Sequence, residues 1–158
     1  MDISRVEKNF LLVDEKFKKL FNIIQRVEDN NKNFELTILS LDDDDDIINL
    51  FYKKYFRKYS NIRHIYADNY RDFKLFKKEY NIDIFIIDIL MPDINGIEVA
   101  SKLRKSDKII ISSAVTGDYI NEIKLLKVTH PNIVWINKHY SEKILYDTVM
   151  TLWLHNKN

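Results

Sequence analysis

Five short apolar segments, separated by amphipathic stretches, constrain the fold of this chain more than any other feature of its sequence. Each segment is rich in isoleucine or other apolar residues, and the predicted strands are Leu36 to Leu41, Ile62 to Tyr66, Ile82 to Ile87, Ile109 to Ser112 and Ile133 to Ile136. The stretches that follow them have helical spacing of apolar residues, and the predicted helices are 45–59, 70–80, 96–104, 119–128 and 141–154. Strands that alternate with helices predict an α/β fold with a doubly wound, five-stranded parallel sheet.

Acidic residues follow the first and the third of these predicted strands. The first strand runs directly into five consecutive aspartates, 42–46, and the third delivers Asp88 into a loop that contains a proline and a glycine. Ligands of doubly wound sheets bind beyond the carboxyl ends of the strands, beside the point where the strand order reverses. We therefore expect Asp42 and Asp43 to face Asp88 at this edge of the sheet.

A carboxylate in such a place can act as a nucleophile toward a phosphoryl donor. The negative charge crowded between its oxygens and the incoming group must be neutralised, and a divalent cation and a lysine are the usual solution. Mg²⁺ prefers oxygen ligands and keeps several waters, so two or three carboxylates from different loops suffice to hold it. The pattern thus predicts a Mg²⁺ site at Asp42, Asp43 and Asp88, whereas the acids at 44–46 are typical of a helix N-terminus.

The first 33 residues carry a separate apolar stripe. Its members recur at alternating intervals of three and four residues, and they are Ile3, Val6, Phe10, Val13, Phe17, Leu20, Ile24 and Val27. This spacing predicts an amphipathic helix with a heptad phase within 1–33, followed by a separate domain over 34–158. Such a stripe would expose a large patch if left in solvent. We expect it to be buried either in a homodimer or by docking on the rest of its own chain.

The overall composition excludes some partners. Lysine and arginine number 25 against 24 aspartates and glutamates, so the net charge of +1 does not favour nucleic-acid binding. There is no cysteine, no signal-peptide pattern at the N-terminus and no apolar run near the roughly 20 residues that span a bilayer. The sequence therefore predicts a cytoplasmic protein that is not embedded in a membrane.

Five motifs in a fixed order, within residues 34–154, resemble the receiver domain of response regulators in two-component signalling. They are the acids after Leu41, the segment Ile84 to Gly96 around Asp88, the run Ser112-Ser113-Ala114, the aromatic Trp135, and Lys138, 50 residues beyond Asp88. The resemblance implies a flavodoxin-like fold with strand order 2-1-3-4-5 and five helices, to which this chain adds its N-terminal amphipathic helix. It also implies a signalling phosphoacceptor that reacts through its own residues, not an enzyme with turnover.

The resemblance assigns a role to each site residue. Asp88 is the phosphoacceptor, Asp43 the direct Mg²⁺ ligand and Asp42 a ligand that acts mainly through water. The main-chain carbonyl of Leu90 completes the metal contacts. For the phosphoryl oxygens, the contacts are the Ser113 hydroxyl and the Lys138 ammonium, and Ser113 and Trp135 form the switch pair. The implied phosphoryl donor is a histidine kinase or a phosphotransfer protein, and the implied output is a protein contact.

The chain also departs from the family pattern. His139 stands where a proline usually follows the lysine, and the loop at 128–132 lacks its usual Gly-Ala. Leu90 and Val115 are apolar at positions that orient the attacking water, which predicts a long-lived aspartyl phosphate. Two alternatives stay open: a pseudo-receiver that binds partners without phosphorylation, and a Mg²⁺-dependent phosphohydrolase with Asp88 as nucleophile. Such a hydrolase needs a second acid where Leu90 stands.

Overall fold

The structure is a computed structural model of the whole chain. It describes residues 35–44, 56, 58–59, 61–138 and 142–155. The helix predicted within 1–33 lies outside the described residues, and so does nearly all of the helix predicted over 45–59.

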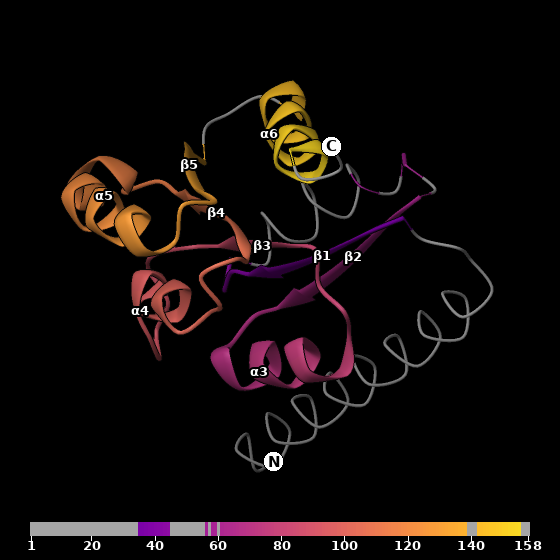
Figure 1. Cartoon of the computed structure of the whole chain (residues 1–158). Coiled ribbons are helices and arrows are strands. Elements are labelled where there is room, and N and C mark those ends of the chain that lie inside the picture. Colours follow the sequence, from indigo (N-terminus) through magenta and orange to yellow (C-terminus); the bar gives the residue numbers. More distant parts are fainter. Residues whose placement is uncertain (1–34, 45–55, 57, 60, 139–141, 156–158) are drawn as a thin grey trace, which may run out of the picture. The chain divides into compact units, whose positions relative to one another are not determined.

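A five-stranded, fully parallel sheet forms the centre of the described part (Figure 1). Its strands are β1 (Leu36–Leu41), β2 (Ile62–Ala67), β3 (Ile84–Ile87), β4 (Lys108–Ser113) and β5 (Ile133–Asn137). They lie in the order β2-β1-β3-β4-β5, which confirms the predicted order. β3 begins two residues later than predicted. The preceding Asp83 is bonded to β1 through its side chain, because its Oδ2 accepts a hydrogen bond from the Thr37 N–H at 2.7 Å.

Four α-helices and one short 3₁₀ helix are seen among the described residues. They are α3 (Tyr70–Glu79), α4 (Gly96–Ser101), the 3₁₀ helix η2 (Thr116–Tyr119), α5 (Ile120–Thr129) and α6 (Glu142–Leu154). α4 ends three residues before its predicted end. Beyond it, Asp107 accepts hydrogen bonds from both the main-chain N–H and the guanidinium of Arg104, which closes a turn. None of the described helices is long and apolar enough to cross a bilayer.

The helices bury both faces of the sheet. On one face, α3, α4 and α5 contribute Phe73, Val99 and Ile123 to a cluster with alternate strand residues such as Phe85 and Ile87. The opposite face is covered by α6, whose apolar residues recur every four positions, and the buried members of that helix are Leu145, Val149 and Trp153. Figure 1 shows the sheet between α6 and the pair α3 and α4. The four residues of β3 are almost wholly buried, as expected for a central parallel strand.

The strand register decides where the acids lie. Leu41 in β1 pairs with Ile87 in β3, so Asp42 and Asp88 follow their strands at the same level. The main chain continues this alignment, because the Asp88 N–H donates to the Leu41 carbonyl at 2.9 Å. Two residues far apart in the sequence are thereby held side by side at the carboxyl edge of the sheet.

Candidate functional site

Asp42 and Asp88 form the buried floor of the site, with only 2% and 6% of their surface exposed. Lys138, which follows β5, contacts both carboxylates. Its Nζ lies 2.8 Å from Asp42 Oδ2 and 3.0 Å from Asp88 Oδ2. The structure therefore brings together three of the residues that the sequence predicted for the site, from the ends of three different strands.

The charges of this trio depend on their burial. Burial raises the pKa of Asp42 to about 6, although hydrogen bonds from Lys138 and from the Asp44 N–H oppose the rise. Burial alone would lower the pKa of Lys138, but its bonds and charge interactions with Asp42 and Asp88 outweigh that effect and raise it. Lys138 is therefore an ammonium group at neutral pH. The carboxyl group of Asp42, with its pKa of about 6, becomes a carboxylate only as the pH rises through that value.

The acids also fit a divalent cation. One carboxylate oxygen from each of Asp42, Asp43 and Asp88 can be chosen so that all lie within 4.8 Å of one another, with Asp43 exposed at the mouth. Asp88 Oδ1 is buried and has no hydrogen-bond partner among the described residues. Leaving such an oxygen unpaired costs about 1–3 kcal/mol or more, a cost that a bound cation removes. Three grouped carboxylates, one of which has an oxygen without a hydrogen-bond partner among the described residues, suit Mg²⁺, which prefers oxygen ligands.

The loop after Asp88 is folded tightly onto the acid that precedes it. Leu90 and Asn95 form an isolated antiparallel bridge, and the Gly96 N–H donates to the Ile89 carbonyl at 2.8 Å. A Cβ atom on Gly96 would lie 1.8 Å from the Asp88 carbonyl oxygen, so only glycine fits there. Sequence reasoning recognised Gly96 as part of the loop motif but could not detect this contact with the main chain of Asp88.

Ser113 and Trp135 lie on the neighbouring strands β4 and β5, Ser113 at the last position of β4 and Trp135 in the middle of β5, opposite Ile111. Ser113 is buried at the end of β4, and its carbonyl accepts a hydrogen bond from the Lys138 N–H at 3.3 Å. Trp135 is half-buried and packs against the cluster beneath α5, while Lys127 Nζ lies 5.6 Å from the centroid of its ring. These placements are compatible with the predicted switch pair, whose roles stay a prediction.

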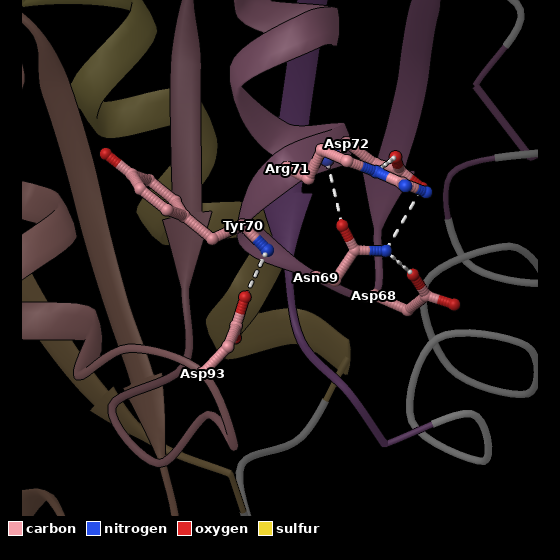
Figure 2. A network of polar contacts seen from close by, with 6 residues as sticks. All are labelled: Asp68, Asn69, Tyr70, Arg71, Asp72 and Asp93. Atoms are coloured by element: carbon pink, nitrogen blue, oxygen red, sulfur yellow. Dashed lines mark hydrogen bonds and ion pairs between the residues drawn. The ribbon is translucent and has the colours of Figure 1, made fainter.

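Asp93 proves to be a structural acid of the loop and not one of the grouped metal donors. Its Oδ2 accepts a hydrogen bond from the Tyr70 N–H, at the start of α3, over 3.1 Å (Figure 2). Its partner could not be predicted from the sequence, because it lies 23 residues away.

His130 is a residue that sequence reasoning missed. It is 5% exposed, its Nε2 lies 3.1 Å from the Leu103 carbonyl, and its Nδ1 lies 2.8 Å from Thr129 Oγ1. The imidazole thus ties the end of α5 to the residues after α4, in the loop that lacks the usual Gly-Ala. In the sequence, the missing Gly-Ala of this loop is the feature that could have drawn attention to His130. Its spacing from the other three histidines does not suit a metal site.

Comparisons with known proteins agree on one family. The family model for the response regulator receiver domain matches residues 38–147. A search of curated proteins found no match. Among solved structures, a Francisella response regulator receiver domain is 25% identical, with a TM-score of 0.64 over 78% of this chain and 100% of that one.

Two further structures are similar. The response regulator TrrA from Thermotoga maritima, solved in complex with Mg²⁺ and BeF, is 27% identical, with a TM-score of 0.63 over 74% of this chain and 98% of that one. The chemotaxis protein CheY4 of Vibrio cholerae has a TM-score of 0.64 over 74% of this chain and 98% of that one, and at 18% identity it supports the fold alone.

Proposed function

The chain belongs to the response regulator receiver domain family, and on this premise we propose that it accepts a phosphoryl group on Asp88 in a Mg²⁺-dependent reaction. The donor is a histidine kinase or a phosphotransfer protein, and the phosphorylated form signals from the cytoplasm by contact with a partner protein. One observation carries the proposal: the unpaired, buried Asp88 Oδ1 lies beside two further carboxylates and the Lys138 ammonium.

The residues of the site divide the chemistry among them. An oxygen of Asp88 attacks the phosphorus, the bond from phosphorus to the donor imidazole breaks, and an acyl phosphate forms on Asp88. Lys138 is held as a cation beside Asp88 and pairs with a phosphoryl oxygen after transfer. The Ser113 hydroxyl donates to another phosphoryl oxygen. Asp42, Asp43, Asp88 and the Leu90 carbonyl are the groups that would hold Mg²⁺, which would supply positive charge to offset the negative charge of the transferred group.

The proposal can be tested with a small-molecule phosphodonor and with a mimic of the bound phosphoryl group. The full chain is incubated with Mg²⁺ and acetyl phosphate and weighed as an intact protein, and in parallel it is titrated with beryllofluoride while tryptophan fluorescence is followed. We expect the mass of one phosphoryl group and a fluorescence change, both lost in Asp88→Ala. Asp118→Ala, which removes an exposed acid from η2, is the matched control and should respond like the wild type. Mg²⁺ binding without either response would favour the pseudo-receiver.

Leu90 distinguishes the proposal from the phosphohydrolase alternative. Leu90 is apolar and 50% exposed, so its side chain supplies no acid or base that could protonate a leaving group or activate water. We therefore predict that phosphate stays on Asp88 far longer than seconds once the donor is removed. The measurement is the decay of the intact mass of purified phosphoprotein, and a half-life of seconds would contradict the prediction.

A further inference from the structure

Asp93 connects the loop that follows the phosphoacceptor to a neighbouring helix. This exposed residue lies in the loop between β3 and α4, and Figure 2 shows its carboxylate directed at the first N–H of α3. The bond joins Asp93 Oδ2 to the Tyr70 nitrogen over 3.1 Å and across 23 residues of sequence. It is a tertiary contact that neither element needs in order to form locally.

The start of α3 has an N-cap residue of its own, Asn69, in addition to its contact with Asp93. The side-chain oxygen of Asn69 accepts a hydrogen bond from the Asp72 N–H at 2.9 Å, as an N-cap residue does. The Asn69 amide nitrogen donates to Asp68 at 2.6 Å and to Asp72 at 3.1 Å (Figure 2). Because the Asn69 cap does not involve Asp93, the bond from Tyr70 to Asp93 ties the loop to a helix end that has a cap of its own.

The loop between β3 and α4 contains Leu90, the residue whose carbonyl is assigned to the metal. Its base is fixed where Gly96 packs on Asp88 and where Leu90 forms a bridge with Asn95. Asp93 fixes the part of the loop between these bridge partners, against α3. A main-chain carbonyl can bind Mg²⁺ only if it is held near the octahedral geometry that this ion demands. The contacts at the base and the tip restrain the loop, as this requirement demands.

We propose that Asp93 is a positioning residue for the metal site: its hydrogen bond to the Tyr70 N–H holds the loop so that the Leu90 carbonyl can bind Mg²⁺. The inference rests on the proposed function. Asp93 itself is not one of the grouped carboxylates, and its role is to hold the loop. A competing explanation is electrostatic, since any acid near the pocket attracts a cation, and the choice of variants must separate the two.

Three variants of the full chain make that separation. Asp93→Ala removes both the charge and the hydrogen bond. Asp93→Asn removes the charge but keeps a side-chain oxygen that can accept from the Tyr70 N–H. Asp68→Asn removes one charge beside the start of α3 and keeps an oxygen for the Asn69 amide, so it is the matched electrostatic control. For each protein, Mg²⁺ alone is titrated and its dissociation constant is derived from the rise in the unfolding midpoint and from tryptophan fluorescence.

We expect Asp93→Ala to weaken Mg²⁺ binding by about ten-fold, as losses of supporting contacts around metal ligands do. Asp93→Asn and Asp68→Asn should weaken it equally and by no more than about two-fold, because exposed charges are screened by salt. Two results would overturn the inference and leave the proposed function intact. In the first, Asp93→Ala and Asp68→Asn bind Mg²⁺ with equal affinity. In the second, Asp93→Asn binds Mg²⁺ as weakly as Asp93→Ala does. A wild-type chain with no response to Mg²⁺ overturns the proposed function as well.

Discussion

At the scale of the residue, Asp42 carries a cost that the site imposes on the fold. Its pKa is raised by burial from 3.8 to about 6, so the native state holds this proton more tightly than the unfolded chain does. The folded state is therefore favoured at low pH, and this contribution is lost as the pH rises from about 4 through about 6. Above that range the buried carboxylate is ionised at the expense of stability.

We predict that Asp42→Asn stabilises the Mg²⁺-free protein at about pH 8 by roughly 1–3 kcal/mol, because the amide removes the ionisation penalty. The gain should vanish near pH 4, where the carboxyl is protonated in the native wild type. Urea unfolding at both pH values measures it. Added Mg²⁺ should stabilise the wild type and not the variant. A variant less stable than the wild type at about pH 8 would mean that the ion pair with Lys138 outweighs the cost of burial.

The close approach of Gly96 to the main chain of Asp88 leads to a second prediction at this scale. We expect Gly96→Ala to destabilise the fold by about 2–3 kcal/mol, because its methyl group meets the Asp88 main chain, which cannot move without disturbing the site. Gly117→Ala is the matched control, since a Cβ there has no heavy atom within 4 Å, and it should be neutral or slightly stabilising. The midpoints of urea unfolding decide, and equal midpoints for the two variants would contradict the proposed clash.

At the scale of the element, the helices on one face of the sheet are joined by buried polar contacts as well as apolar packing. His130 ends α5 with its N–H bonded to the Leu126 carbonyl, and its ring reaches the Leu103 carbonyl. The side chain therefore replaces the small residues usual in this loop with a link between α4 and α5. Loss of the ring would leave a buried carbonyl without that partner.

We predict that His130→Ala lowers the free energy of unfolding by about 2–4 kcal/mol, from the lost burial and the unpaired carbonyl together. His155→Ala, at an exposed position beyond α6, is the matched control and should change it by less than about 0.5 kcal/mol. Urea unfolding followed by circular dichroism measures both. Equal stabilities of the two variants would show that the link between the helices contributes nothing.

The elements themselves were predictable where a local pattern defines them. β1 matches its predicted bounds because an apolar run ends abruptly at the aspartates. The ends of β3 and α4 differ from the prediction because they depend on Asp83 reaching Thr37 and on Asp107 closing a turn with Arg104. Such bonds join residues in ways that no periodicity reveals.

The same distinction holds for the site. Asp42 and Asp88 could be grouped from the sequence, because the carboxyl ends of parallel strands converge at one edge, and the resemblance to receiver domains added Lys138. The contacts of Asp93 and His130 could not, since their partners lie 23 and 27 residues away and are main-chain groups of no distinctive sequence. Main-chain partners are invisible to any reading of side-chain patterns.

At the scale of the whole molecule, the site exists only when the sheet is complete. β1 supplies Asp42, β3 supplies Asp88, and the end of β5 supplies Lys138, whose ammonium bridges the two carboxylates. Because β5 lies at the edge of the sheet beside β4, displacement of that edge would separate the lysine from the acids. If Asp88 is phosphorylated as proposed, Lys138 would link the state of Asp88 to the position of β5, because the same ammonium contacts Asp88 and follows that strand.

The apolar stripe at 3–27 extends the argument to assembly. The segment precedes the receiver, lies outside the described residues and carries eight apolar residues in heptad phase. Apolar surface of this extent favours association, and we propose that two copies of the chain pair through it. The full chain should then sediment as a dimer. A variant that lacks 1–33 should sediment as a monomer and keep the beryllofluoride response, because the residues proposed for the site all follow Leu41.

Val13→Lys places a charge within the stripe and should dissociate the dimer in the same way, whereas Asp14→Lys, at the neighbouring position outside it, should leave the dimer intact. Sedimentation velocity over a range of protein concentrations distinguishes the species. A monomeric full chain would contradict pairing through this segment. Loss of the beryllofluoride response in the shortened chain would instead show that the segment supports the receiver itself.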